Sequence, residues 1–264
     1  MIGKAMAVSA IAVIALGASS CNLSIWPQFR GGPALTGENL NETTFTASNV
    51  GTLVQRFVGV AGDKVDSSPA VVNGVAYVGS DDHKLYAFDA NGVGDCSGSP
   101  TTCAPLWTGL TDGYLFSSPD VASGVVYVGS SNGTVYAFDA SGTTNCSGTP
   151  KTCTPLWTAR SGGEFNSSPT VVNGVVYIGS TEGNVYAFDA SGTTNCSGTP
   201  KTCTPLWTAD TGSQVISTPA VASGTVFVTS LGGTLSAFDA SGTTGCSGTP
   251  KTCAPLWTAA NVSF

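Results

Sequence analysis

Charged side chains are scarce in this sequence, at 9% of the residues, and it holds one histidine and no pair of adjacent cysteines. Nine lysine and arginine residues stand against 16 aspartate and glutamate residues, so the net charge is −7. A nucleic-acid-binding protein needs basic side chains that displace phosphate counterions, and this composition argues against that class. The apolar run at residues 5–17 is shorter than the ~20 residues that a helix needs to span a bilayer.

What the sequence does contain begins with a segment typical of protein export. Lys4 precedes the apolar run, and three small residues then lead to Cys21. We therefore expect residues 1–20 to be a signal peptide. The segment resembles a bacterial lipoprotein signal, which implies lipidation of Cys21 and contact with a membrane through that anchor. Soluble export is the alternative, because Ala18 stands where such signals usually have leucine.

A 50-residue repeat accounts for most of the chain. Four segments align without a gap, and they start near Ser67, Ser117, Ser167 and Ser217. Each contains short runs rich in valine, tyrosine, phenylalanine and threonine, separated by glycine, asparagine, serine or proline. These runs are about four to eight residues long and lack the helical spacing of 3.6 residues. The pattern therefore predicts an all-β protein.

Four strands of this kind, joined by tight turns, make one blade of a β-propeller. The turns are predicted at Asn73-Gly74, Ser123-Gly124, Asn173-Gly174 and Ser223-Gly224. A single sheet cannot bury both of its faces, whereas a stack of neighbouring sheets does. We predict a β-propeller of four-stranded antiparallel blades, with residues 21–52 as a lead-in segment and residues 53–264 as the repeats.

The cysteines support export to an oxidising compartment. Eight of the nine form pairs seven residues apart, one pair per repeat, and Cys21 is left over. A zinc site is a poor match, because no histidine lies nearby and no unit has a second pair. The predicted disulfides, each closing a hairpin tip on the surface, are Cys96–Cys103, Cys146–Cys153, Cys196–Cys203 and Cys246–Cys253.

The repeat resembles the PQQ-like β-propeller family, a superfamily that includes quinoprotein alcohol dehydrogenases and BamB-like outer-membrane assembly lipoproteins. The run from Tyr136 to Gly142 with Trp157 is similar to the family's tryptophan-docking motif, and the run from Trp26 to Gly31 is similar to the segment before its first blade. The resemblance implies that one tryptophan and one aspartate per unit lock adjacent blades together. Those residues are Trp107, Trp157, Trp207, Trp257, Asp89, Asp139, Asp189 and Asp239.

The tryptophan ring should fill the gap between neighbouring sheets, because it is large and recurs once in every unit. The recurrent aspartates are expected to fix turns by hydrogen bonding.

A catalytic or binding site should break the symmetry of the repeats. The single histidine, His83, lies in a turn and is explained by solvent exposure as well as by a metal site. Asp120 could place one carboxylate near the central channel, but one carboxylate is neither an acid–base pair nor a calcium cage. The other varying residues are candidates for partner contact and fall near strand ends. They are Asp112, Arg160, Glu164 and Asp210.

Enzymes of the family hold PQQ with a calcium ion, a catalytic aspartate and a disulfide between adjacent cysteines. None of these features can be matched residue by residue here, so we expect no catalytic residue, no cofactor and no metal ligand. The main hypothesis is an exported, non-enzymatic scaffold that binds other proteins at the cell envelope. Two alternatives stay open: a fragment of a PQQ-dependent dehydrogenase, and a surface carbohydrate-binding or adhesive repeat protein.

Four repeats are fewer than the seven or eight blades typical of the family, so we expect an incomplete ring. The explanations are a truncated reading frame, which we favour, an arc that pairs with another chain, or a small ring closed by the lead-in segment. An open arc would expose sheet faces and invite self-association. We expect a periplasmic, outer-membrane-anchored or extracellular protein.

Overall fold

The structure, a computed structural model, describes residues 26–30, 32–35 and 48–261. The expected signal peptide, Cys21 and much of the lead-in segment lie outside these residues. The regular elements of the described part are β-strands, apart from one short 3-10 helix, η1 (Val50–Thr52). No helix among the described residues has the length and apolar character that crossing a bilayer requires.

Each repeat forms one four-stranded antiparallel unit, as predicted. Unit 1 contains β2 (Ala70–Val72), β3 (Val75–Ser80), β4 (Lys84–Asp89) and β7 (Trp107–Leu110). Unit 2 contains β8 (Asp120–Ala122), β9 (Val125–Gly129), β10 (Thr134–Asp139) and β13 (Trp157–Arg160). Unit 3 contains β14 (Thr170–Val172), β15 (Val175–Gly179), β16 (Asn184–Asp189) and β19 (Trp207–Asp210). Unit 4 contains β20 (Ala220–Ala222), β21 (Thr225–Ser230), β22 (Thr234–Asp239) and β25 (Trp257–Ala260).

The first turn of every unit explains why its first two strands pair closely. In unit 1, Asn73 and Gly74 have φ values of 51° and 78°. Positive φ at both central residues is the geometry of a type I′ turn, whose twist matches that of the flanking strands. The same pair of positive φ values recurs in the other three units. The predicted Asn-Gly and Ser-Gly turns are thus confirmed.

All four predicted disulfides are formed, and each lies in a small hairpin between the third and fourth strands of its unit. The hairpins are β5 (Cys96–Ser97) with β6 (Thr102–Cys103), β11 (Cys146–Ser147) with β12 (Thr152–Cys153), β17 (Cys196–Ser197) with β18 (Thr202–Cys203), and β23 (Cys246–Ser247) with β24 (Thr252–Cys253).

These hairpins are more than surface tips. The second strands of the last three, β12, β18 and β24, pair in parallel with the outer strand of the preceding unit: Thr152 lies opposite Thr108, and Cys153 lies opposite Gly109. Cys153 is buried as a result, while the Gly148–Pro150 tip is exposed. The expectation of a plain stapled tip was incomplete, because the pairing partner lies 44 residues away and cannot be read from local spacing. Each of these three hairpins fastens its own unit to the one before it.

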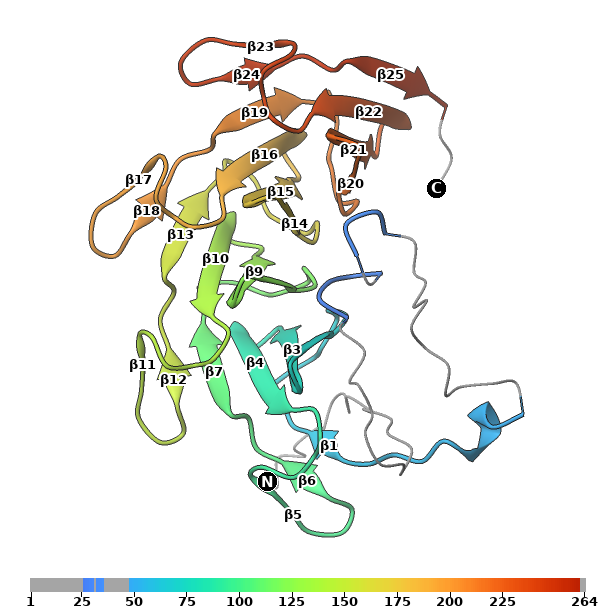
Figure 1. Ribbon diagram of the computed structural model, residues 1–264, viewed down its shortest axis with the longest axis vertical. Helices are drawn as coiled ribbons and strands as arrows, with labels where there is room; N and C mark the ends of the chain where they lie inside the picture. Colours follow the sequence, from blue (N-terminus) through green and yellow to red (C-terminus); the bar gives the residue numbers. More distant parts are fainter. Residues whose placement is uncertain (1–25, 31, 36–47, 262–264) are drawn as a thin grey trace, which may run out of the picture.

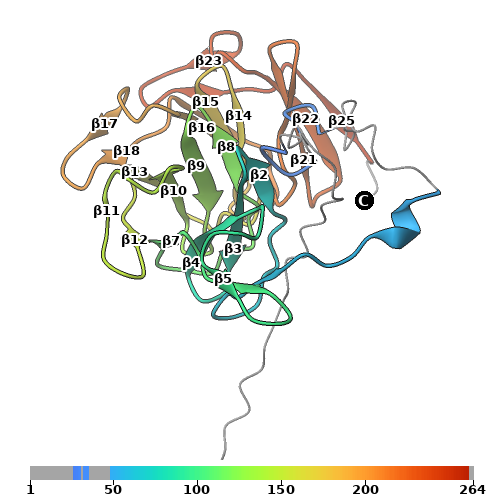
Figure 2. The same ribbon diagram turned by 60° about the horizontal axis from the view of Figure 1, so that its bottom comes forward.

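The units form an open arc, as Figures 1 and 2 show. The sheets stay separate and do not close into a ring. Strands β2, β8, β14 and β20 line the inner side, where neighbouring members contact each other, and the disulfide hairpins project from the outer side. Residues 26–30 and 32–35 of the lead-in segment lie along the inner edge, where Trp26 bridges to Val71 and the Pro33 carbonyl accepts a hydrogen bond from Val221 N–H.

Candidate functional site

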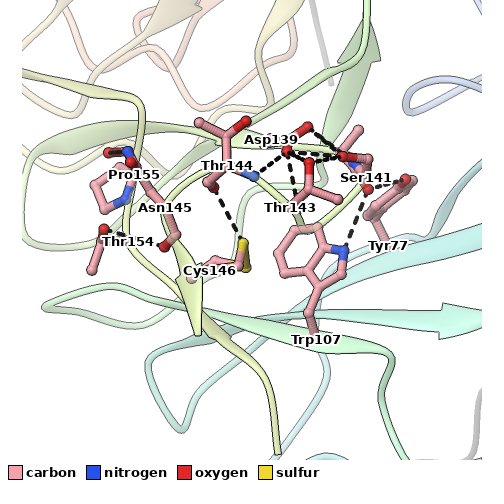
Figure 3. The surroundings of a disulfide bond; sticks show 12 residues. Tyr77, Trp107, Asp139, Ser141, Thr143, Thr144, Asn145, Cys146, Thr154 and Pro155 are labelled. Carbon is pink, nitrogen blue, oxygen red and sulfur yellow. Dashed lines mark hydrogen bonds between the residues drawn. A yellow bond between two sulfur atoms is a disulfide. The ribbon is translucent and has the colours of Figure 1, made fainter. Parts of the chain in front are cut away.

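The joint between units 1 and 2 is built around one carbonyl oxygen. Trp107 Nε1 donates to the Ala140 carbonyl at 3.3 Å, and the Tyr77 hydroxyl donates to the same oxygen at 2.9 Å (Figure 3). The indole ring also lies against Phe138, with centroids 6.3 Å apart. Gly142 is required beside the ring, because its φ is +62° and a Cβ there would come within 2.1 Å of Trp107 Cδ1. Both donors come from one unit and the acceptor from the next.

The same joint recurs twice more along the arc. Trp157 and Trp207 donate to the Ala190 and Ala240 carbonyls, and both rings are at most 2% exposed. Trp257 differs, because its side chain is 47% exposed. The expectation that every tryptophan fills a gap between sheets therefore fails at Trp257. Among the described residues, no unit follows unit 4 to cover that ring.

The recurrent aspartates fix the turn that leads into the hairpin. Asp139 accepts hydrogen bonds from the backbone N–H groups of Thr143 and Thr144 and from the Ser141 hydroxyl (Figure 3). Burial raises the pKa of Asp139, but these hydrogen bonds outweigh burial and hold the pKa well below its usual range. This turn carries the backbone from Asp139 to Gly142, and so positions the residues that contact Trp107.

The stretch of chain just before unit 1 supplies a fourth, reduced version of the joint. Phe57 precedes β1 (Val58–Gly59), which pairs in parallel with β6 just as β7 pairs with β12. Phe57 is buried, and it contacts the position of a Cβ at Gly92 as Trp107 does at Gly142. The chain therefore places a phenylalanine in front of unit 1, 50 residues before the first joint tryptophan.

One rim of the arc carries an exposed aromatic cluster that breaks the repeat symmetry. Tyr114 and Phe116, in the segment that connects β7 to β8, are 48% and 37% exposed. Tyr114 contacts Phe116 on one side and His83 on the other, with ring centroids 5.9 Å and 5.0 Å apart. Leu110, at the end of β7, is also exposed. We call Leu110, Tyr114, Phe116 and His83 the rim patch.

The predicted partner-contact residues lie on this same rim. Asp112 is exposed, and its backbone N–H donates to the Tyr136 hydroxyl at 3.0 Å. Arg160, Glu164 and Asp210 are exposed at the corresponding strand ends of the following units. Asp120 does not join them, because it is 2% exposed at the inner edge of the arc. Asp112, Arg160, Glu164 and Asp210 thus lie at or near strand ends on the exposed rim, and Asp120 begins β8 on the inner side, where its carboxylate was expected.

Sequence reasoning missed the apolar members of the rim patch. Comparison of equivalent positions in the repeats would have found them. Leu110 is equivalent to Arg160 and Asp210 of the next two units, and Tyr114 is equivalent to Glu164 of the next unit. Titratable residues are the usual signal of a functional site, whereas this one differs from its equivalent in the next unit by having apolar residues.

The described residues do not fit a calcium–quinone site. Calcium is bound by six to eight oxygen ligands in proteins. Asp120 is the one acidic side chain that is buried among the described residues, and its Oδ2 already accepts a hydrogen bond from Val171 N–H. No group of three or more histidine, cysteine, aspartate or glutamate side chains in the described part is arranged to hold a metal ion.

Four-stranded units stacked face to face around an inner edge define a β-propeller-type repeat protein. The sequence profile of one family, described as outer membrane protein assembly factor BamB, matches residues 36–147 and 149–262. The chain therefore belongs to this family of PQQ-like repeats. No curated protein sequence matches the chain.

Solved structures are similar in fold. BamB from Moraxella catarrhalis is 20% identical, with a TM-score of 0.53 over 72% of this chain and 51% of that one. The computationally designed Ika8 protein is 12% identical, with a TM-score of 0.54 over 72% of this chain and 50% of that one. The computationally designed Ika4 protein is 13% identical, with a TM-score of 0.51 over 70% of this chain and 96% of that one. The chain thus spans about half the length of BamB and Ika8.

Proposed function

We propose that this protein is an exported, non-enzymatic scaffold that binds another protein at the cell envelope through the rim patch. The observation that carries the proposal is an exposed pair of aromatic side chains, Tyr114 and Phe116, at positions where the next unit has Glu164 and Asn166. Exposed aromatic clusters with a polar surround are typical of protein-binding surfaces, where tyrosine is enriched among the residues that dominate affinity.

The surroundings of the rim patch favour a partner with an apolar segment. The exposed carboxylate of Asp112 lies next to the patch in the chain, while the patch itself offers the rings of Tyr114 and Phe116. An apolar core with a polar rim is the usual arrangement of such interfaces. The matched family's description as an assembly factor agrees with a role in binding other envelope proteins.

The disulfides support export. Four of them lie in a chain of 264 residues, and disulfides persist in the periplasm and outside the cell but are rare in the reducing cytosol. Lipidation of Cys21 would tether the arc to a membrane and leave the rim free to contact neighbours. The periplasmic or the external face of the outer membrane would then be where it acts.

The test uses residues that the chain itself tolerates at equivalent positions. Tyr114→Glu and Phe116→Asn copy Glu164 and Asn166 of the next joint, so the fold should be unaffected. Asp210→Arg, which copies Arg160, is the matched control on the same rim. The expected result is that chemical cross-linking in intact envelopes captures a partner with the wild type and the control, and that the double variant loses it.

Capture of the same partner by the double variant would refute the role of the rim patch. Binding of a carbohydrate on a glycan array, if it is lost in the same double variant, would show that the rim patch binds a sugar and not a protein.

A further inference from the structure

Carboxylates gather beside the rim patch. Asp81 lies in the turn between β3 and β4, just before His83 of the patch. Its backbone N–H donates to the Lys64 carbonyl, so this turn lies against the segment that leads into β2. That segment carries two more aspartates, both exposed, and a fourth is exposed in the segment that holds Tyr114. We call these four carboxylates the acidic flank: Asp63, Asp66, Asp81 and Asp112.

The acidic flank is not neutralised by ion pairs within the described part of the chain. Asp82, the other acid of the same turn, forms an ion pair with Lys84 at 3.1 Å. None of the four carboxylates of the acidic flank forms an ion pair with another described residue. Their charges are therefore available to a partner.

The carboxylates of the acidic flank also act on one another. Burial raises the pKa of Asp81, and the negative charges of Asp66 and Asp63 raise it further, while Lys64 offsets them only in part. Like charges in close proximity disfavour the ionised form. A positive charge placed beside these groups would relieve their repulsion.

The acidic flank breaks the repeat symmetry, as the rim patch does. Three of its members belong to unit 1, and the equivalent residues of units 2 and 3 are all uncharged. Those of unit 2 are Gly113, Phe116 and Ser131, and those of unit 3 are Gly163, Asn166 and Thr181. Since these units form the same sheet without the carboxylates, the fold does not require them.

The acidic flank and the rim patch form one continuous surface at the joint between units 1 and 2. The His83 carbonyl accepts hydrogen bonds from the backbone N–H and the hydroxyl of Thr111. The His83 ring lies edge-on to Tyr114, with centroids 5.0 Å apart. Both units of this joint are described, so the exposure of the rings follows from the joint itself.

We propose that the rim patch and the acidic flank together bind a partner segment in which arginine or lysine stands next to apolar residues. The inference rests on the proposed function, because it names the chemistry of the protein that the rim patch binds. A cationic side chain of the partner stacks on the exposed ring of Tyr114, with the carboxylates around it. Apolar side chains of the same segment pack on Phe116 and Leu110.

Charge complementarity selects this partner over others. An acidic segment or an anionic lipid surface would be repelled by the acidic flank. An uncharged apolar segment would cover the rings but leave the repulsion among the carboxylates in place. A segment that is both cationic and apolar matches the two halves of the surface, and the net charge of −7 favours its approach.

Titration of synthetic peptides against the purified chain tests the proposal. A short peptide of alternating arginine and leucine should bind, and its affinity should fall as salt is raised from about 50 to about 500 mM, because salt screens the charges. A peptide of alternating glutamate and leucine should not bind, and one of alternating arginine and serine should bind more weakly. Failure of the arginine–leucine peptide to bind would overturn the proposal, as would equal binding of the glutamate–leucine peptide.

A double variant that copies other units locates the binding. Asp66→Asn and Asp81→Ser introduce the residues found at Asn166 and Ser131, so the fold should be kept, which thermal unfolding checks. The affinity for the arginine–leucine peptide should fall by roughly fivefold to tenfold, the effect of removing two surface charges.

The matched control removes two carboxylates that lie away from the rim patch. Asp95→Asn and Asp210→Ala introduce the residues found at Asn145 and Ala260. This control has the same net charge as the acidic-flank variant and should bind the peptide like the wild type. Equal affinity of the two double variants would overturn the proposal.

Cross-linking in intact envelopes separates this inference from the proposed function. The acidic-flank variant should capture less of the partner than its control. If Tyr114→Glu with Phe116→Asn loses the partner while the acidic-flank variant keeps it, the inference of a cationic partner fails alone. If the Tyr114→Glu, Phe116→Asn variant keeps the partner, the proposed function and this inference fail together.

Discussion

The Asp120 carboxylate of unit 2 accepts a 2.6 Å hydrogen bond from the backbone N–H of Val171 in unit 3. The equivalent N–H groups of the other units, at Val71, Val121 and Val221, donate to backbone carbonyls of the lead-in segment. Asp120 therefore supplies the acceptor for the one inner strand whose N–H group does not reach a described carbonyl of that segment. This symmetry-breaking carboxylate thus links two neighbouring inner strands of the arc.

This position predicts a pH dependence of stability. Burial raises the pKa of Asp120 to about 7, against the opposing effect of the hydrogen bond from Val171. An unfolded aspartate has a pKa of ~4. Between that pH and a pH of about 7, the folded chain binds more protons than the unfolded chain, so the free energy of unfolding falls as pH rises. The loss is at most about 1.4 kcal/mol per pH unit and stops above the folded pKa.

Asp120→Asn should remove this effect while keeping an oxygen acceptor for Val171. Urea unfolding at about pH 5 and about pH 8 should show the variant gaining stability relative to the wild type at the higher pH. Asp112→Asn, on the exposed rim, is the control and should track the wild type. Equal curves for all three proteins would refute the assignment.

The joint tryptophans should differ in their contribution to stability according to burial. Trp157→Ala leaves a cavity between units 2 and 3 and should lower the free energy of unfolding by about 3 to 5 kcal/mol. Trp257→Ala should cost less than about 1 kcal/mol, because that ring is half exposed. Thermal unfolding of the two variants checks this, and equal losses would contradict it.

Alanine substitutions at two glycines with similar φ angles should distinguish the stability cost of a steric clash from the cost of backbone strain. Gly142 and Gly124 both have positive φ, but a Cβ at Gly142 would overlap Trp107, whereas a Cβ at Gly124 has nothing within 4 Å. Gly124→Ala should cost about 1 to 2 kcal/mol from the backbone alone. Gly142→Ala should cost clearly more, as measured by urea unfolding. Losses of the same size would show that the indole does not press on the glycine.

The disulfide hairpins should matter because they fasten neighbouring units. Replacing Cys146 and Cys153 by alanine should lower stability by about 2 to 3 kcal/mol. Thr149→Ala, at the exposed tip of the same hairpin, should have no measurable effect. A thiol titration of the denatured, non-reduced wild type should find none of the eight paired cysteines free, and several free thiols would contradict the pairing.

The sequence was sufficient to predict the strands, the turns and the disulfides, because each depends on residues close together in the chain and recurs four times. The docking of β12 on β7 could not be predicted, since a two-residue strand carries no signal for its distant partner. The exposure of Trp257 depends on what lies beside unit 4, which its own residues do not specify. Asp120 was recognised as unusual, but its hydrogen bond to Val171 required the relative placement of two units.

The most direct test of the account measures the solvent exposure of each joint tryptophan in the native protein. Hydroxyl-radical footprinting with mass spectrometry reports oxidation residue by residue. The account predicts rapid oxidation of Trp257 and protection of Trp107, Trp157 and Trp207. Similar oxidation of all four rings would show that consecutive units are not stacked through their indoles, and would contradict the arrangement described here.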